Sequence, residues 1–169
     1  MCKGVLTSTT GYVVVDNMKI CDVLKKETIL ADLKAQNKKG ILEELVAPVS
    51  EIANVNQEYL VKVLMERERL GSTGIGGGIG IPHGKMKDIE SLVLGFGLSR
   101  KGVDFESLDG QPTHIFFLLI TPENSTGLHL KLLARISRIL KDDPFKTRLL
   151  NARSSDEIFD IITEEDEDF

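Results

Sequence analysis

The sequence has no tryptophan, only two cysteines and an aromatic content of 5%. Two cysteines are too few for a disulfide framework, and Cys2 and Cys21 lack the spacing of metal ligands. We interpret Cys21 as a small buried apolar residue. Because aromatic side chains are scarce, the core has to rest on isoleucine, leucine and valine. At 169 residues the chain is long enough for one domain with a sizeable core.

Long apolar runs and excess positive charge are lacking as well. No apolar segment approaches the roughly 20 residues that a bilayer span requires, so we do not expect the chain to be embedded in a membrane. A formal net charge of −5 and a pI of about 5.3 argue against a nucleic-acid-binding surface. Residues 1–17 carry a single lysine and do not resemble a secretory signal. These absences predict a soluble cytoplasmic protein.

The chain divides into three parts. We expect residues 1–17 to be a leader, either flexible or pairing late as a strand. Residues 18–163 form the domain, and residues 164–169 form a solvated acidic tail. The domain contains three predicted strands, over residues 28–33, 91–98 and 113–120. The last of these is apolar on both faces, as expected of a central strand.

Apolar residues recur at helical spacing between and after these strands. Pro48 falls inside the first such segment, residues 41–52, and should kink or split that helix. Further helix boundaries are expected at an Asn56 cap, a Gly71 stop, a Ser125 or Thr126 cap, a Pro144 break and a Ser155 cap. Strands that alternate with helices predict an α/β domain with a central sheet.

One stretch, residues 66–85, shows no apolar repeat of helical or strand period. It contains seven glycines, and ordering so much glycine costs conformational entropy, so a loop of this kind needs a functional reason. Backbone N–H groups without neighbouring Cβ atoms can turn toward an anion or a partner's surface. At its end Pro82 stiffens the chain before His83, and Gly84 leaves the far side of the imidazole uncrowded. This arrangement predicts that His83 carries out the chemistry.

Familiar phosphate-binding motifs fail in this stretch. A G-x-G-x-x-G frame would place its third glycine at an isoleucine, and a P-loop ending at Gly84-Lys85 would need serine or threonine where Met86 stands. We therefore expect neither nucleotide binding nor another cofactor. Metal-ligand spacing is also absent among the three histidines, His83, His114 and His129.

A histidine nucleophile remains. Neutral imidazole can attack phosphorus directly, and phosphoryl transfer depends mostly on positioning and charge stabilisation. Such a site needs a fixed tautomer, a cation and several N–H or O–H donors. Arg67 at the end of a predicted helix supplies the cation, Ser72 and Thr73 offer hydroxyls, and the glycine backbone, including Gly84, offers amides. His129 lies in the first turn of a predicted helix, where the dipole favours an anion.

Each of these residues also has a purely structural interpretation. The two histidines could be loop, capping or packing residues, and the two hydroxyl residues could brace the loop. Arg67 could be an ordinary cation at a helix end, and Arg69 competes for its role if the helix register differs. For His114, at the head of an apolar strand, a core or edge position is the better interpretation.

Residues 71–85, Gly-Ser-Thr-Gly-Ile-Gly-Gly-Gly-Ile-Gly-Ile-Pro-His-Gly-Lys, resemble the active-site segment of the EIIA domains of the phosphotransferase system, of the fructose/mannitol type. The resemblance extends over about residues 18–163 and includes Phe-Leu-Leu-Ile-Thr-Pro-Glu-Asn-Ser-Thr-Gly-Leu-His-Leu from residue 117. It implies a mixed sheet flanked by helices and a phosphohistidine intermediate. It further implies that His83 accepts a phosphoryl group from the carrier protein HPr, and that His129 and Arg67 support it.

The family has two branches, and the sequence leaves both open. Sugar-transport EIIA domains pass the group to a cysteine of an EIIB partner. The nitrogen-regulatory branch, PtsN or EIIA-Ntr, acts through its phosphorylation state on other proteins. Residues 66–76 are more similar to the nitrogen branch, for which the donor is phospho-HPr or its nitrogen-branch paralogue. The alternative from another class is a pure binding module, which the intact Ile-Pro-His-Gly segment at residues 81–84 disfavours.

The resemblance also predicts how His83 and its surroundings are arranged. In this phosphorelay the modified imidazole nitrogen alternates from one carrier protein to the next. We therefore expect Nε2 of His83 to be modified, with Nδ1–H held by a backbone carbonyl. We expect the partner surface to ring the glycine loop, and its apolar contacts to include Ile75, Ile79 and Met86.

Overall fold

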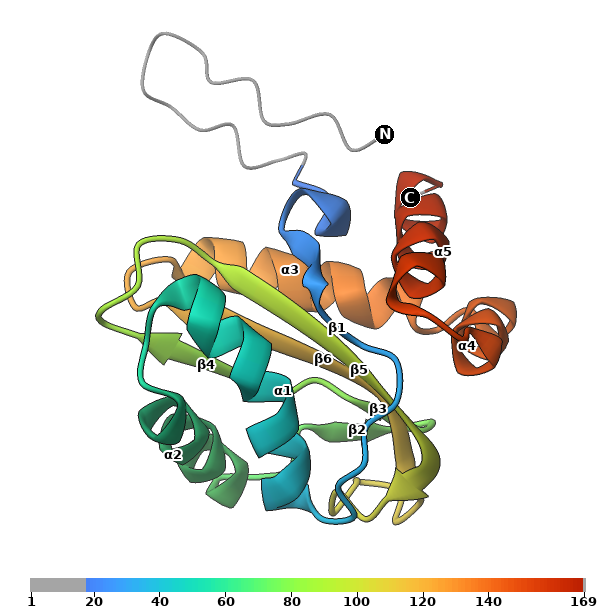
Figure 1. The fold of residues 1–169 in the computed structure, drawn as a ribbon, viewed down its shortest axis with the longest axis horizontal. Coiled ribbons are helices and arrows are strands. Elements are labelled where there is room, and N and C mark those ends of the chain that lie inside the picture. Colours follow the sequence, from blue (N-terminus) through green and yellow to red (C-terminus); the bar gives the residue numbers. More distant parts are fainter. Residues whose placement is uncertain (1–17, 169) are drawn as a thin grey trace, which may run out of the picture.

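A six-stranded mixed sheet, with β6 (Thr113–Pro122) at its centre, organises the computed structural model, which describes residues 18–168 (Figure 1). The strand order is β1-β5-β6-β3-β2, and β4 also pairs with β6. β5 lies antiparallel to β6, whereas β3 and β4 lie parallel to it. The expected α/β fold with a central mixed sheet is confirmed. The expected leader, residues 1–17, lies outside the described residues.

The remaining strands and the helices follow a simple order along the chain. A 3₁₀ turn at Ile20–Asp22 precedes β1, and the other elements are β1 (Leu24–Leu30), α1 (Lys38–Ala53), α2 (Gln57–Arg69), β2 (Gly74–Gly76), β3 (Ile79–Gly80), β4 (His83–Met86), β5 (Val93–Val103), α3 (Thr126–Ile139), α4 (Asp143–Asn151) and α5 (Ser155–Glu167). The predicted strands at residues 91–98 and 113–120 are thus confirmed. The strand predicted at residues 28–33 begins earlier and ends at Leu30.

The strand β6 is central because both of its faces are apolar. Alternate residues point to opposite faces of a strand, and two separate cores form on the two sides of the sheet. Ile115, Phe117 and Leu119 join the core under α3, α4 and α5. Phe116, Leu118 and Ile120 join the core under α1 and α2. Figure 1 shows α1 and α2 on the near face of the sheet and α3 behind it.

α1 runs as one helix through Pro48, so the predicted split is wrong. Leu45, Val46 and Val49 are buried against the sheet around the proline, and this packing holds the helix together although one hydrogen bond is lost. Ile52, at the end of the predicted apolar face, is 37% exposed. For α2 the predicted Asn56 cap is confirmed, since its side chain accepts a hydrogen bond from the Tyr59 amide at 2.8 Å.

The glycine-rich stretch is not the loop that we expected, because it begins in α2 and contains the short strands β2, β3 and β4. Gly76, Gly77 and Gly78 have φ of +96°, +65° and +79°, a conformation that side chains other than glycine rarely adopt. They turn the chain from β2 to β3, which then hydrogen-bonds to β6. At Gly80 an added Cβ would lie 3.1 Å from a ring carbon of Phe116. Turn geometry and close packing therefore account for these glycines.

The C-terminal segment also differs from the prediction. Ser154 rather than Ser155 caps α5, with the Glu157 amide donating to its hydroxyl at 3.1 Å, while the Ser155 hydroxyl donates to the Ile29 carbonyl. The helix continues to Glu167, so residues 164–168 are not a solvated tail. Asp166 is fully buried and accepts the Ile20 amide at 2.7 Å. A charge count cannot show that a carboxylate is buried with its partners.

Candidate active site

His83, the first residue of β4, is held by a short contact to its own backbone. Its Nδ1 lies 2.7 Å from the carbonyl oxygen of Ile81. A carbonyl oxygen can only accept a hydrogen bond, so Nδ1 carries the proton and Nε2 keeps its lone pair. The expectation that a backbone carbonyl holds Nδ1–H is confirmed. His83 is half-buried, and its backbone pairs in parallel with β6 opposite Leu119. Its imidazole keeps one nitrogen, Nε2, that could act as a nucleophile.

The surroundings of His83 keep it neutral. Burial lowers the pKa of His83, and the positive charge of Arg67 lowers it further, while the bond to the Ile81 carbonyl and the charge of Glu68 oppose this shift. The net pKa lies below the ordinary value of 6.5. A histidine that attacks phosphorus has to be unprotonated, and these surroundings meet that requirement at neutral pH.

His129 lies beside His83, as the resemblance to the EIIA family implied. The two ring centroids are 5.2 Å apart, with an angle of 60° between the ring planes. His129 is only 4% exposed, and its Nδ1 lies 2.8 Å from the Thr121 hydroxyl. Burial, followed by the charges of His83 and Lys85, lowers the pKa of His129 to about 4. The second imidazole is therefore also neutral at physiological pH.

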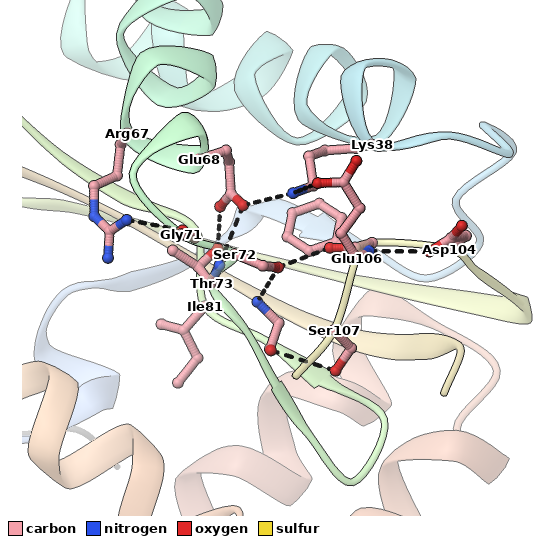
Figure 2. Close-up of polar contacts among 12 residues, drawn as sticks. Lys38, Arg67, Glu68, Gly71, Ser72, Thr73, Ile81, Asp104, Glu106 and Ser107 are labelled. Carbon is pink, nitrogen blue, oxygen red and sulfur yellow. Dashed lines mark hydrogen bonds and ion pairs between the residues drawn. The ribbon is translucent and has the colours of Figure 1, made fainter. Parts of the chain in front are cut away.

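Arg67 places a positive charge close enough to His83 to lower the pKa of its imidazole. It lies in the last turn of α2, and its guanidinium donates to the carbonyl of Gly71 at 3.0 Å (Figure 2). This bond uses one of five N–H donors, and no carboxylate pairs with Arg67 among residues 18–168. Arg69, the competitor, is exposed and lines a groove with Lys39 and Glu58 of the helix pair α1 and α2. The register therefore favours Arg67.

Ser72 and Thr73 have hydroxyls that already bind other protein groups. The Ser72 hydroxyl donates to the Phe105 carbonyl at 2.8 Å and accepts the Gly74 amide at 3.0 Å. Thr73 is buried, and both its hydroxyl and its amide bind the carboxylate of Glu68 (Figure 2). The structure therefore favours the bracing interpretation of these two residues.

Gly84 lies against α2. A Cβ at this position would be 3.4 Å from Val63 Cγ1 and 3.5 Å from Leu64 Cδ2. Both distances are ordinary van der Waals contacts, so a Cβ would fit against the helix, and the expectation that Gly84 leaves the far side of the imidazole uncrowded stays a prediction. Replacing this glycine would place a side chain between β4 and the helix that carries Arg67.

Three residues near the two histidines make contacts that were not predicted from the sequence. Thr121 orients His129, Lys85 donates to the Thr126 hydroxyl at 2.9 Å at the start of α3, and Glu68 anchors Thr73. A polar residue at the end of an otherwise apolar strand was the available signal for Thr121. For Glu68 no signal was available, because the Glu-Arg-Glu-Arg run does not indicate which of its four charged side chains is buried.

The predicted apolar contacts for a partner are only partly accessible. Ile75 is 45% exposed, but Ile79 and Met86 are each 4% exposed and belong to the two cores. The prediction for Ile79 and Met86 is wrong because both side chains face the interior from strands paired with β6. Leu130, next to His129, is instead 60% exposed. His114 stays outside the site, as expected, with its Nδ1 2.9 Å from the Ser99 carbonyl.

Comparison with known proteins identifies the class to which this fold and paired-histidine site belong. Residues 22–165 match the family described as phosphoenolpyruvate-dependent sugar phosphotransferase system, EIIA 2. The chain belongs to this family of EIIA domains. In the described part of the chain no helix has the length and apolarity to cross a membrane.

Relatives come from both branches of the family. The chain is 40% identical over 145 residues to a nitrogen regulatory protein of Bradyrhizobium diazoefficiens, covering 86% of this chain and 95% of the relative. It is 38% identical over 150 residues to the fructose-specific EIIABC component of Bacillus subtilis, covering 88% of this chain but 24% of that protein. The crystal structure of nitrogen regulatory protein IIA-Ntr from Neisseria meningitidis superimposes with a TM-score of 0.81 at 30% identity, covering 85% of this chain and 98% of that chain.

Proposed function

We propose that His83 accepts a phosphoryl group on Nε2 from phospho-HPr or its nitrogen-branch paralogue. The observation that carries this proposal is the 2.7 Å contact between His83 Nδ1 and the Ile81 carbonyl, because it commits the lone pair to Nε2. Membership of the EIIA family supplies the reaction class.

The transfer is a displacement at phosphorus. The Nε2 lone pair of His83 forms the new N–P bond while the N–P bond of the donor phosphohistidine breaks, and that electron pair returns to the donor imidazole. The proton on Nδ1 stays in place. As Nε2 bonds to phosphorus the His83 ring becomes positive, and the Ile81 carbonyl dipole stabilises that charge.

Arg67 and His129 act on the phosphoryl oxygens in this scheme. The guanidinium offsets the negative charge that spreads over those oxygens. His129 is neutral, and with the Thr121 hydroxyl donating to Nδ1, its Nε2–H becomes a hydrogen-bond donor to the phosphoryl group. A neutral donor stabilises the transferring group without preventing its later departure.

The role of the phosphorylated protein is regulation of nitrogen or other metabolism through target proteins. The similarity to a nitrogen regulatory protein over 95% of that relative's length supports this assignment. The second candidate is an EIIA component that passes the group to an EIIB cysteine for fructose/mannitol-type sugar uptake. The 38% identity to a fructose-specific EIIABC component favours it.

The test is intact mass after incubation with phosphoenolpyruvate, enzyme I and HPr, repeated with the nitrogen-branch counterparts of both proteins. We expect a gain of one acid-labile phosphoryl group that is absent in His83→Ala and present in His114→Ala. No gain with either donor would make the protein a binding module.

The phosphorylated protein is then mixed with a purified fructose-type EIIB domain. Retention of the group supports the regulatory role, and rapid transfer to EIIB supports the sugar-uptake role.

A further inference from the structure

Glu68 is a carboxylate that the proposed reaction does not use, although it lies one residue from Arg67. It is only 6% exposed, in the last turn of α2. Lys38 of α1 donates to it at 2.9 Å, and the side chain of Lys38 is itself only 11% exposed. Burying an ion pair costs desolvation free energy, so such a pair is weak evidence for a role in stability alone.

The second partner of Glu68 is Thr73. The Thr73 amide donates to Glu68 Oε2 at 3.1 Å, and the Thr73 hydroxyl donates to Glu68 Oε1 (Figure 2). Both oxygens of the carboxylate are therefore engaged, and Thr73 is held at two of its atoms. Lys38 is fixed in turn by Glu106 at 3.1 Å and by the face of the Phe105 ring, whose centroid lies 4.9 Å from Nζ.

Thr73 connects the Glu68–Lys38 pair to the backbone that holds His83. Its carbonyl accepts the Ile81 amide at 3.0 Å. The carbonyl of the same Ile81 accepts Nδ1–H of His83 at 2.7 Å. A continuous series of contacts therefore connects the buried carboxylate of Glu68 to the nitrogen that sets the His83 tautomer, through Thr73 and Ile81.

We propose that Glu68 is a positioning residue for His83: its buried pair with Lys38 anchors Thr73, and Thr73 holds Ile81 so that the Ile81 carbonyl keeps the proton on Nδ1. The consequence for phosphoryl transfer rests on the function proposed above, whereas the consequence for the tautomer does not. The charge of Glu68 also raises the pKa of His83, opposite to the effect of Arg67.

The decisive variant is Glu68→Gln, which keeps the shape of the side chain and removes its charge. Nitrogen-15 NMR of the His83 imidazole reads the tautomer and the pKa directly, whether or not the protein is a phosphoryl acceptor. We expect the wild type to carry the proton on Nδ1, and Glu68→Gln to show a mixture of tautomers and a lower His83 pKa. Glu66→Gln, an exposed position on the same helix, is the matched control and should leave both unchanged.

The same variants are then compared in the phosphoryl-uptake assay. Loss of an outer partner that orients a metal-binding histidine costs about tenfold to a hundredfold in activity, and we expect an effect at the lower end of this range for His83. We expect Glu68→Gln to lower the maximal rate by about tenfold with little change in the donor concentration for half-maximal rate, because the partner surface is untouched. A change confined to that concentration would place Glu68 in the docking surface and overturn the proposal.

Wild-type tautomer and pKa in a folded Glu68→Gln protein would also overturn it. If circular dichroism shows that Glu68→Gln does not fold, Thr73→Val removes the same side-chain contact from the other side and replaces it in both measurements. Unchanged NMR and rate in Thr73→Val would then refute the positioning role. A wild type that takes up no phosphoryl group would refute the proposed function only, since the NMR result stands independently.

Discussion

The imidazoles of His83 and His129 meet edge to face, with ring centroids 5.2 Å apart. His83 belongs to β4 and His129 to α3. Along the chain, these two elements are separated by β5 and β6, the two longest strands of the sheet. The pKa values of both rings are lowered, in each case chiefly by burial. Two neutral rings can stand this close without repulsion, and each keeps one nitrogen for chemistry.

Replacing His129 should slow phosphoryl uptake without abolishing it. His129→Ala removes the ring together with its Nε2–H, so the donor to the phosphoryl oxygens is lost while Nε2 of His83 remains. We expect a fall in the initial rate by about a hundredfold, as for loss of one preorganised donor. Rates come from intact mass at short times, with His114→Ala as control. Complete loss of uptake would show that His129 itself is an obligatory acceptor.

Arg67 should hold down the pKa of His83. Because its charge is one cause of the lowered value, Arg67→Gln is expected to raise the His83 pKa toward 6.5 and to slow phosphoryl uptake. The wild-type ring should titrate below 6.5. The measurement is the pH dependence of the His83 ring proton signals. A wild-type pKa at or above that value would contradict the described burial of His83.

The buried His129 should make the protein sensitive to acid. In the unfolded chain it takes up a proton below 6.5, but in the folded protein only at about 4. Between these values the unfolded state binds more protons, so the free energy of unfolding falls as the pH falls, by up to about 1.4 kcal/mol per pH unit. His129→Gln should reduce this slope in urea unfolding experiments. Equal slopes in the two proteins would show that His129 titrates normally when folded.

Asp166 should contribute strongly to stability. It is fully buried, accepts the Ile20 amide at 2.7 Å, and pairs with Arg135 of α3, whose guanidinium also donates to the Asp166 carbonyl at 2.8 Å. Removing one partner of a buried pair leaves a charge without compensation, so Asp166→Ala should lower the free energy of unfolding by about 3 kcal/mol. Urea unfolding measures the loss. The exposed Asp168→Ala is the matched control and should change little.

The candidate site could be predicted from the sequence because its signals are local. Arg67 at a helix end, the glycines that follow it and Pro82 before His83 all lie within residues 66–85. The exclusion of nucleotide motifs needed only counting of positions. His129 was accessible as a helix-start residue, but its contact with His83 was known only through the resemblance to a family.

Errors arose where burial decided the outcome. Met86 and Ile79 were expected on the surface because they flank a glycine-rich segment, yet both face the interior from strands paired with β6. Asp166 was assigned to a solvated tail because it lies among acidic residues. In each case the composition of the segment does not indicate burial, because burial depends on packing partners that are distant in the sequence.

The sequence by itself determined the α/β class of the fold, the apolar character of β6 and the imidazole that we propose as the reactive group. These follow from periodicity, from the conformational freedom of glycine and from the restricted φ of proline. Only the tertiary structure decided which histidines meet, which nitrogen of His83 carries the proton, and that Glu68 rather than a neighbouring charge is buried. Those features depend on distances between residues far apart in the chain, and a local pattern carries no information about such distances.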